Sequence, residues 1–131
     1  MKRYQELWRR ILAETLSART GRKVEESEIV SELPPRPELG DLAFPLFPFA
    51  KLLRRSPKDV ALELAAAVRE RAAEGRGQAE AAGPYLNVRL ERPRVVAEVL
   101  EEVLAQGAGY GNGGLNAGKR IIVEFSSPNT N

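Results

Sequence analysis

A glycine-rich stretch near the carboxyl end limits how much of this 131-residue chain can share one hydrophobic core. Six of the twelve residues from 107 to 118 are glycine, which favours a flexible connection over a helix or a strand. The residues before it are numerous enough to bury a core without disulfides or bound metals. We therefore expect one domain over 1–106, a connection over 107–118 and the start of a second domain over 119–131.

Hydrophobic periodicity and breaker residues divide the first domain into short elements. They predict a helix over 3–19 that ends at Gly21, a helix from Pro57 to about Glu74, and a third helix that begins at Pro93. Strands or extended segments are expected at 28–33, within 42–50, and at 78–83 and 85–90, with a short helix over 51–55. This order predicts an α+β fold of two layers: helix, two strands, helix, two strands and an exit helix. Pro34, Pro35 and Pro37 exclude regular structure between the first two extended segments.

The end of the chain is a buried-type strand without a partner in the sequence. Ile121, Ile122 and Val123 form this apolar run, and we interpret it as the first strand of a truncated, Rossmann-like domain. Four polar residues follow it and offer a carboxylate, two hydroxyls and an amide to a cationic small molecule: Glu124, Ser126, Ser127 and Asn129. Ordinary turn formation explains the same residues equally well.

The composition excludes several kinds of chemistry. The chain has no cysteine and no histidine, so it has no disulfides, no thiol catalysis and none of the usual zinc ligands, and we assign no catalytic or metal-binding residue. Twenty basic residues against 18 acidic ones leave a charge of only +2, so attraction to phosphate requires clustering. The densest cluster contains Lys51, Arg54 and Arg55, which would either contact a nucleic-acid backbone or form a solvated face. No apolar stretch spans a bilayer and no signal peptide is visible, so we expect a cytoplasmic location.

The last predicted strand of the first domain carries two residues suited to an unpaired base. Leu86, Val88 and Leu90 alternate with Tyr85 and Asn87, which therefore share the opposite face of the strand. An aromatic ring stacks on a base, and an amide beside it binds the edge of the base by hydrogen bonds. The alternative is a hydrogen-bonded surface pair on an edge strand.

Three segments together resemble the arginyl-tRNA synthetases, which are class I enzymes. Residues 123–129, Val-Glu-Phe-Ser-Ser-Pro-Asn, resemble the segment just before the His-x-Gly-His signature of that family. Residues 40–51 resemble its Gly-Asp motif with the Ala-Lys helix that follows, and residues 83–88, Gly-Pro-Tyr-Leu-Asn-Val, resemble its Gly-Tyr/Phe-x-Asn strand. The segments occur in the order of the family and cover nearly the whole chain.

The resemblance implies an N-terminal additional domain that recognises the D-loop of tRNA(Arg), cut off before the signature histidines. Tyr85 would stack on a D-loop base and Asn87 would bind its edge, with backbone contacts from Lys51, Arg54 and Arg55. Glu124, Ser126, Ser127 and Asn129 would line the arginine pocket of the intact enzyme, a ligase that uses ATP and Mg²⁺ to join L-arginine to tRNA(Arg). The fragment itself would hold no cofactor and would be inactive, and the resemblance implies a monomeric parent.

A different class of function remains open at this point. The chain would be a protein–protein interaction domain without an RNA role if its basic residues served only solubility. Phe44, Phe47 and Phe49 would then face a protein partner. The oligomeric state distinguishes the two hypotheses, because a tight homodimer that buries these aromatic residues would favour the interaction domain.

Overall fold

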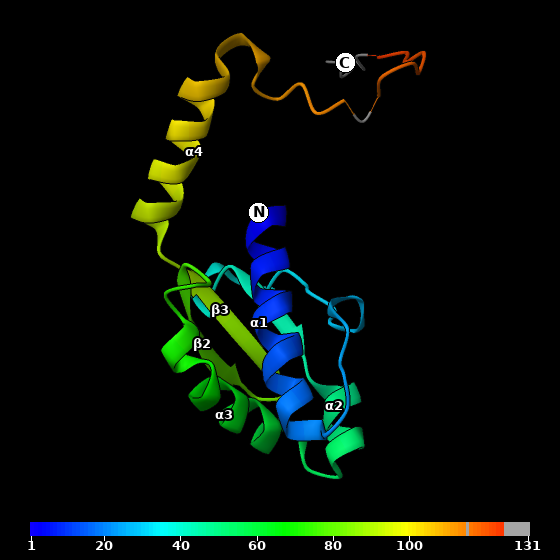
Figure 1. The fold of residues 1–131 in the computed structure, drawn as a ribbon, viewed down its shortest axis with the longest axis vertical. Helices are drawn as coiled ribbons and strands as arrows, with labels where there is room; N and C mark the ends of the chain where they lie inside the picture. Colours follow the sequence, from blue (N-terminus) through cyan, green and yellow to red (C-terminus); the bar gives the residue numbers. More distant parts are fainter. Residues whose placement is uncertain (115, 125–131) are drawn as a thin grey trace, which may run out of the picture. The chain divides into compact units, whose positions relative to one another are not determined.

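The computed structural model describes residues 1–114 and 116–124, and the chain divides into two compact units, Met1–Val96 and Ala97–Asn131 (Figure 1). The helices and strands of the first unit are α1 (Lys2–Thr20), β1 (Leu42–Pro45), α2 (Phe47–Leu53), α3 (Pro57–Ala67), β2 (Gly77–Ala82) and β3 (Tyr85–Leu90). Helix α4 (Arg92–Gln106) begins in this unit and continues into the second. Short 3-10 helices lie at Glu26–Glu28, Pro37–Leu39, Arg69–Arg71 and Gly107–Gly109.

The three strands form an antiparallel sheet in the order β1-β3-β2, so β3 lies in the centre (Figure 1). Leu42 and Phe44 of β1 pair with Val88 and Leu86 of β3, and all four side chains are buried. Helices α1 and α3 complete this core on one face of the sheet, as an α+β fold of two layers requires. The opposite face of the sheet carries Tyr85 and Asn87 and is called the open face below.

Helix α1 forms because its apolar residues repeat at helical spacing, as the sequence predicts. Tyr4, Trp8, Ile11 and Leu16 are all buried, and the helix ends at Gly21, whose φ of 69° suits glycine. Ser56 caps α3 by accepting a hydrogen bond from the backbone N–H of Asp59 at 3.1 Å. The end of α1 and the start of α3 are therefore readable from local residue chemistry.

The end of α3 differs from the prediction. The helix stops at Ala67 rather than near Glu74, and a 3-10 turn follows at Arg69–Arg71. Beyond it the chain approaches the indole of Trp8, which donates a hydrogen bond from Nε1 to the carbonyl oxygen of Gly75 at 2.9 Å. A Cβ on Gly75 would lie 2.4 Å from the indole ring, so only glycine allows this contact. Packing against α1 explains why the chain leaves the helical path early.

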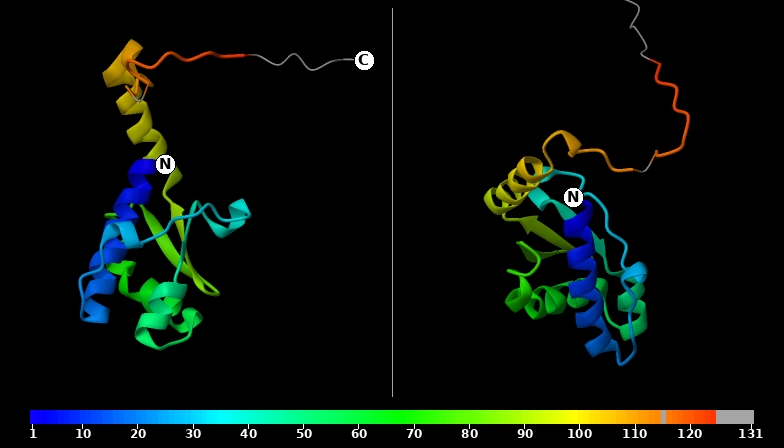
Figure 2. Two further views of the ribbon diagram at one scale, coloured as in Figure 1. Left: turned by 90° about the vertical axis from the view of Figure 1, so that its right-hand side faces the viewer. Right: turned by 45° about the horizontal axis from the view of Figure 1, so that its top comes forward.

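The prediction of a strand at 28–33 is wrong, so one strand rather than two precedes α2. Glu26–Glu28 is a 3-10 helix, and the segment pairs with the sheet only through an isolated bridge between Glu32 and Ala43. The prolines at 34, 35 and 37 lack backbone donors, which prevents the pairing from continuing. The segment instead passes over the open face of the sheet, away from α1 (Figure 2, left).

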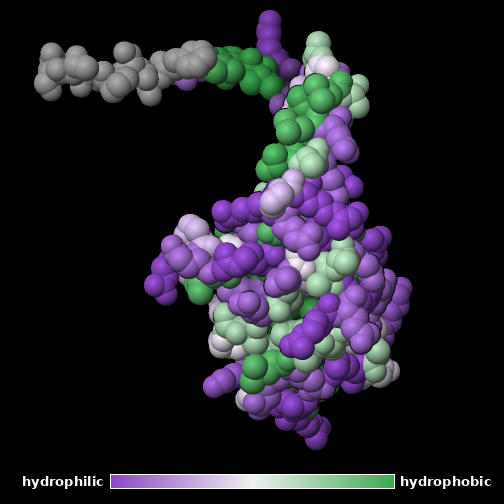
Figure 3. Space-filling view, turned by 90° about the vertical axis from the view of Figure 1, so that its left-hand side faces the viewer, coloured by the Kyte–Doolittle hydropathy of each residue, from purple (hydrophilic) through white to green (hydrophobic). Residues whose placement is uncertain are grey.

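The second unit contains no strand among its described residues. The apolar run at 121–123 has an exposed, irregular backbone, so the predicted first strand of a further domain does not form there. Helix α4 exposes apolar side chains in this unit, including Val99, Leu100 and Leu104, and they colour the helix green in Figure 3. None of the helices in the described ranges combines the length and apolar character needed to cross a membrane.

Candidate functional site

The open face of the sheet brings together residues from all three strands. Antiparallel register places Ala43 of β1 and Glu80 of β2 on either side of Asn87, and Pro45 and Ala82 on either side of Tyr85. Directly paired residues share a face of the sheet, so these side chains surround Tyr85 and Asn87. The small side chains of Ala43 and Ala82 leave room above the central strand.

Asn87 combines burial with an unsatisfied polar atom. Its side chain is only 7% exposed, and its Oδ1 has no hydrogen-bond partner among the described residues. Leaving a buried acceptor unpaired typically costs about 1–3 kcal/mol, and most buried polar atoms avoid this cost. The alternative of a hydrogen-bonded pair on an edge strand is therefore wrong, because β3 is the central strand and the amide oxygen is unpaired.

The ring of Tyr85 is half-buried and is held by a neighbouring aromatic side chain. Phe47, at the start of α2, meets it edge to face, with ring centroids 5.8 Å apart and an interplanar angle of 89°. Leu46, just before α2, also donates a backbone hydrogen bond to the carbonyl of Pro84 at 3.1 Å, which ties the helix to the β2–β3 turn. These contacts restrict the orientation of the ring before any ligand binds.

A cavity of about 350 Å³ opens beside these two residues. It lies in the size range of pockets that hold small planar groups. The lining comes from all three strands, from the β2–β3 turn and from residues 32–39, called the proline-rich segment below. The lining residues are Glu32, Leu33, Pro35, Leu39, Ala43, Ala82, Pro84, Tyr85 and Asn87. None of these residues is basic, and most of the lining is apolar.

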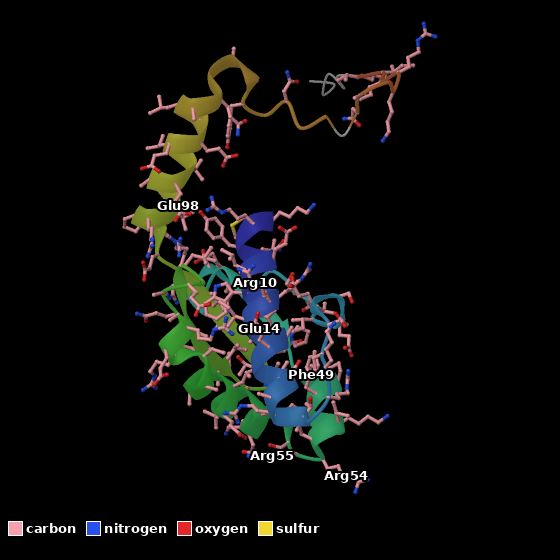
Figure 4. All side chains as sticks on the ribbon, in the orientation of Figure 1. Arg10, Glu14, Phe49, Arg54, Arg55 and Glu98 are labelled. Atoms are coloured by element: carbon pink, nitrogen blue, oxygen red, sulfur yellow. The ribbon has the colours of Figure 1, made fainter. Side chains whose placement is uncertain are left out.

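The basic residues of the predicted cluster lie along α2 and just beyond it. Lys51 is exposed and follows Phe47 by four residues, so it shares a helix face with the aromatic contact to Tyr85. Arg54 is exposed with a φ of 52°, and its side chain extends outward beyond the end of α2 (Figure 4). Lys51 and Arg54 therefore keep their charges accessible to solvent.

Arg55 is placed differently, because its charge is already paired. It forms an ion pair with Glu63 of α3, and Arg19 at the end of α1 pairs with the same carboxylate. Arg19 lies 36 positions earlier in the sequence, and no motif indicated that it would join this cluster. Two guanidinium groups on one carboxylate leave a net positive charge near the end of α2.

The Gly-Asp motif, which contributes to the resemblance, has a structural role here. Gly40 has a φ of 116°, and a Cβ at this position would lie 2.6 Å from the carbonyl oxygen of Val88. Asp41 accepts a hydrogen bond from the backbone N–H of Leu90 at 2.8 Å and lies 3.5 Å from the guanidinium of Arg92. The motif therefore holds the proline-rich segment against β3 and the start of α4.

The strongest shifts of pKa lie away from the open face. Hydrogen bonding to Arg22 lowers the pKa of Glu28 from 4.5 to about 2, and the backbone N–H of Glu25 adds to this effect. A hydrogen bond from Arg71 likewise lowers the pKa of Glu74. These are ion pairs within the fold and indicate no acid–base catalyst.

Of the four predicted arginine-pocket residues, the described part of the chain contains Glu124. Glu124 is exposed in irregular chain, and Ser126, Ser127 and Asn129 lie outside the described residues. No group of three acidic residues close enough to hold a metal ion occurs within residues 1–114 and 116–124.

Two of the three phenylalanines that the protein–protein hypothesis presents to a partner are buried. Phe44 is fully buried and Phe49 is 3% exposed, since both belong to the core. Only Phe47 of the three is exposed, and its ring contacts Tyr85. The three aromatic residues therefore do not form one surface for a partner.

Comparison with known proteins gives one consistent result. The family model for the arginyl-tRNA synthetase N-terminal domain matches residues 6–90. The arginine–tRNA ligase of Treponema pallidum is 47% identical over 130 residues, which cover 96% of this chain and 22% of that protein. The corresponding ligase of Clostridium perfringens is 36% identical over 93% of this chain and 21% of its own length. The chain thus spans about a fifth of the length of these curated relatives.

A solved structure shows the same fold. Thermus thermophilus arginyl-tRNA synthetase superimposes with a TM-score of 0.56 and 28% sequence identity, over 71% of this chain and 15% of that one.

Proposed function

Because this chain belongs to the family of arginyl-tRNA synthetase N-terminal domains, we propose that it is a tRNA-binding module that recognises an unpaired base in the D-loop of tRNA(Arg). The observation that carries this proposal is the buried, unpartnered amide of Asn87 next to the held ring of Tyr85. Most buried polar atoms in folded proteins have a hydrogen-bond partner, so an unpaired amide oxygen beside a cavity is a place where the edge of a base would donate a hydrogen bond.

The two side chains supply complementary parts of base recognition. The Tyr85 ring offers a flat apolar surface on which a base stacks, and the Asn87 amide offers both a donor and an acceptor to the edge of the base. Bases in a helix are already stacked and paired, so this site selects an unpaired base in a loop. The cavity above Ala43 and Ala82 provides the space.

Phosphate contacts would come from the basic residues near α2. Lys51 and Arg54 are exposed and unpaired among the described residues, so each adds a salt-dependent contact to the RNA backbone. Arg55 contributes less than its charge suggests because Glu63 already binds it. We therefore rank Lys51 and Arg54 above Arg55 as backbone contacts.

In the intact enzyme, this module would serve a ligase that joins L-arginine to tRNA(Arg) with ATP and Mg²⁺. The relatives carry the name arginine–tRNA ligase, which supports this part of the proposal. Glu124, Ser126, Ser127 and Asn129 would then line the arginine pocket, with Glu124 facing the cationic side chain of the amino acid. The 131 residues themselves would supply recognition and not catalysis.

The test measures binding of the 131-residue chain to a tRNA(Arg) transcript over a range of salt concentrations. Tyr85→Ala is expected to weaken binding by ~1–3 kcal/mol, the typical contribution of one stacked base. Tyr110→Ala is the matched control, because Tyr110 is an exposed tyrosine in the second unit, 44% accessible and remote in sequence. If the wild-type chain binds the transcript and Tyr85→Ala binds it with equal affinity, the proposed role of Tyr85 is contradicted.

A second arm changes the RNA rather than the protein. A transcript with an altered D-loop base is expected to bind the wild-type chain more weakly, while Tyr85→Ala binds both transcripts alike. Equal binding of both transcripts to the wild-type chain would leave only a basic surface that attracts RNA in general.

A further inference from the structure

The proline-rich segment before β1 exposes an apolar side chain next to the cavity. Leu33 is 72% exposed and lines the cavity together with Asn87 and Tyr85. The segment pairs with the sheet through one bridge only, so sheet formation does not explain its path. Figure 2 (left) shows it on the side of the sheet away from α1.

Both ends of this segment are anchored to the sheet. At one end, Glu32 and Ala43 exchange two backbone hydrogen bonds of 2.8 and 2.9 Å. At the other end, Gly40 packs against the backbone of Val88, and the N–H of Asp41 donates to the carbonyl of Val88 at 2.7 Å. The prolines between these anchors restrict the backbone further. The segment is thus held in place before any ligand arrives.

The cavity suits an uncharged planar ligand. Its lining combines apolar surface from Leu33, Pro35 and Leu39 with the single buried amide of Asn87. No lining residue is basic and Glu32 is acidic, which disfavours a phosphate group. A nucleobase has apolar faces and a hydrogen-bonding edge, so it matches both parts of the lining.

We propose that Leu33 is a further base-contacting residue, and that the segment from Glu32 to Leu39 forms the wall of the pocket that receives the base at Asn87. This inference rests on the proposed function and extends it to a segment without any recognition motif. Leu33 covers one surface of the bound base while Tyr85 stacks on it, so the exposed leucine becomes buried on binding. The contact is apolar and adds no salt dependence.

The experiment compares Leu33→Ala with Val30→Ala in the 131-residue chain. Val30 is the matched control, since it is 53% exposed in the same part of the chain and lies outside the cavity lining. With a tRNA(Arg) transcript, Leu33→Ala is expected to raise Kd about tenfold, whereas Val30→Ala leaves Kd unchanged. The slope of log Kd against log salt concentration stays the same in both variants, and urea unfolding confirms that both remain folded.

A second probe tests whether the effect comes from a base. A series of tRNA(Arg) molecules is assembled, each with an abasic residue at a different D-loop position. At one of these positions, the abasic residue should abolish the difference in Kd between the wild-type chain and Leu33→Ala. An unchanged Kd for Leu33→Ala, together with weakened binding by Tyr85→Ala, would overturn this inference and leave the proposed function intact. If neither substitution changes Kd, the proposed function fails as well. If Leu33→Ala raises Kd with every one of these abasic tRNAs, Leu33 contacts the RNA backbone rather than a base, and the inference is also overturned.

Discussion

Asn87 is the residue at which stability and recognition are expected to conflict. Its amide oxygen is buried without a partner in the described structure, so the folded state bears the cost of removing it from water. The same atom is the hydrogen-bonding group of the proposed site. A variant that removes the amide should therefore unfold less readily and bind RNA more weakly than the wild type.

Replacement of Asn87 by valine should separate the two effects. Asn87→Val removes the unsatisfied amide from a central strand and adds a β-branched side chain, so the free energy of unfolding should rise by about 1 kcal/mol. Binding to the tRNA(Arg) transcript should fall at the same time. Urea unfolding measures the first effect, and Glu80→Val, at the paired position on β2, controls for the gain in strand propensity. A loss of stability in Asn87→Val would mean that the amide has a structural partner.

At the scale of elements, the contact between α1 and the turn before β2 determines where α3 ends. The indole of Trp8 both packs against Gly75 and donates a hydrogen bond to its carbonyl, and the indole is fully buried. This contact joins the first helix to the start of the central hairpin. It also positions β2, which pairs with β3 from Gly77 to Ala82.

A methyl group at position 75 should disrupt this junction. Gly75→Ala places a Cβ 2.4 Å from Trp8, so the two elements must separate, and we expect a loss of about 1–3 kcal/mol in unfolding free energy. Gly109→Ala is the control, since a Cβ there meets nothing within 4 Å. Urea titration with tryptophan fluorescence measures both, because Trp8 is the single tryptophan of the chain. Equal urea midpoints for the two variants would show that the contact between α1 and position 75 accommodates a methyl group without loss of stability.

At the scale of the whole molecule, carboxylates paired with arginine make stability depend on acid pH. The pKa of Glu28 is about 2 in the folded protein and ordinarily 4.5, and the pKa of Glu74 is also lowered. A lowered pKa means that the folded state binds the proton less readily than the unfolded state. This stabilisation is therefore complete above about pH 4.5 and is lost as the pH falls toward 2.

The substitution Glu28→Gln should flatten this acid dependence. Arg22 stays charged throughout, but the amide has no carboxylate charge to lose, so unfolding free energy should fall less steeply between about pH 5 and pH 2 than in the wild type. Added salt should narrow the difference because the pair is exposed. Chemical unfolding at several pH values measures how steeply the unfolding free energy changes with pH in the variant and in the wild type. Parallel curves for variant and wild type would show that the pair does not influence folding.

The sequence determined the elements whose signals are local. Helical spacing predicted α1, the cap at Ser56 predicted the start of α3, and strict alternation predicted β3 with Tyr85 and Asn87 on one face. Alternation of apolar and polar residues fixes the face of a strand whichever strands pair with it. The strand predicted at 28–33 has no such alternation, and it does not form.

Only the tertiary structure decided which distant residues meet. It placed β3 in the centre, buried Asn87, and brought Leu33 to the cavity beside it, and it joined Arg19 to Arg55 through Glu63. None of these contacts has a sequence signature, because each depends on chain segments that pack together from separate parts of the fold. The physical reason is that local patterns set the conformation and face of an element, whereas burial and pairing depend on what the rest of the chain places against it.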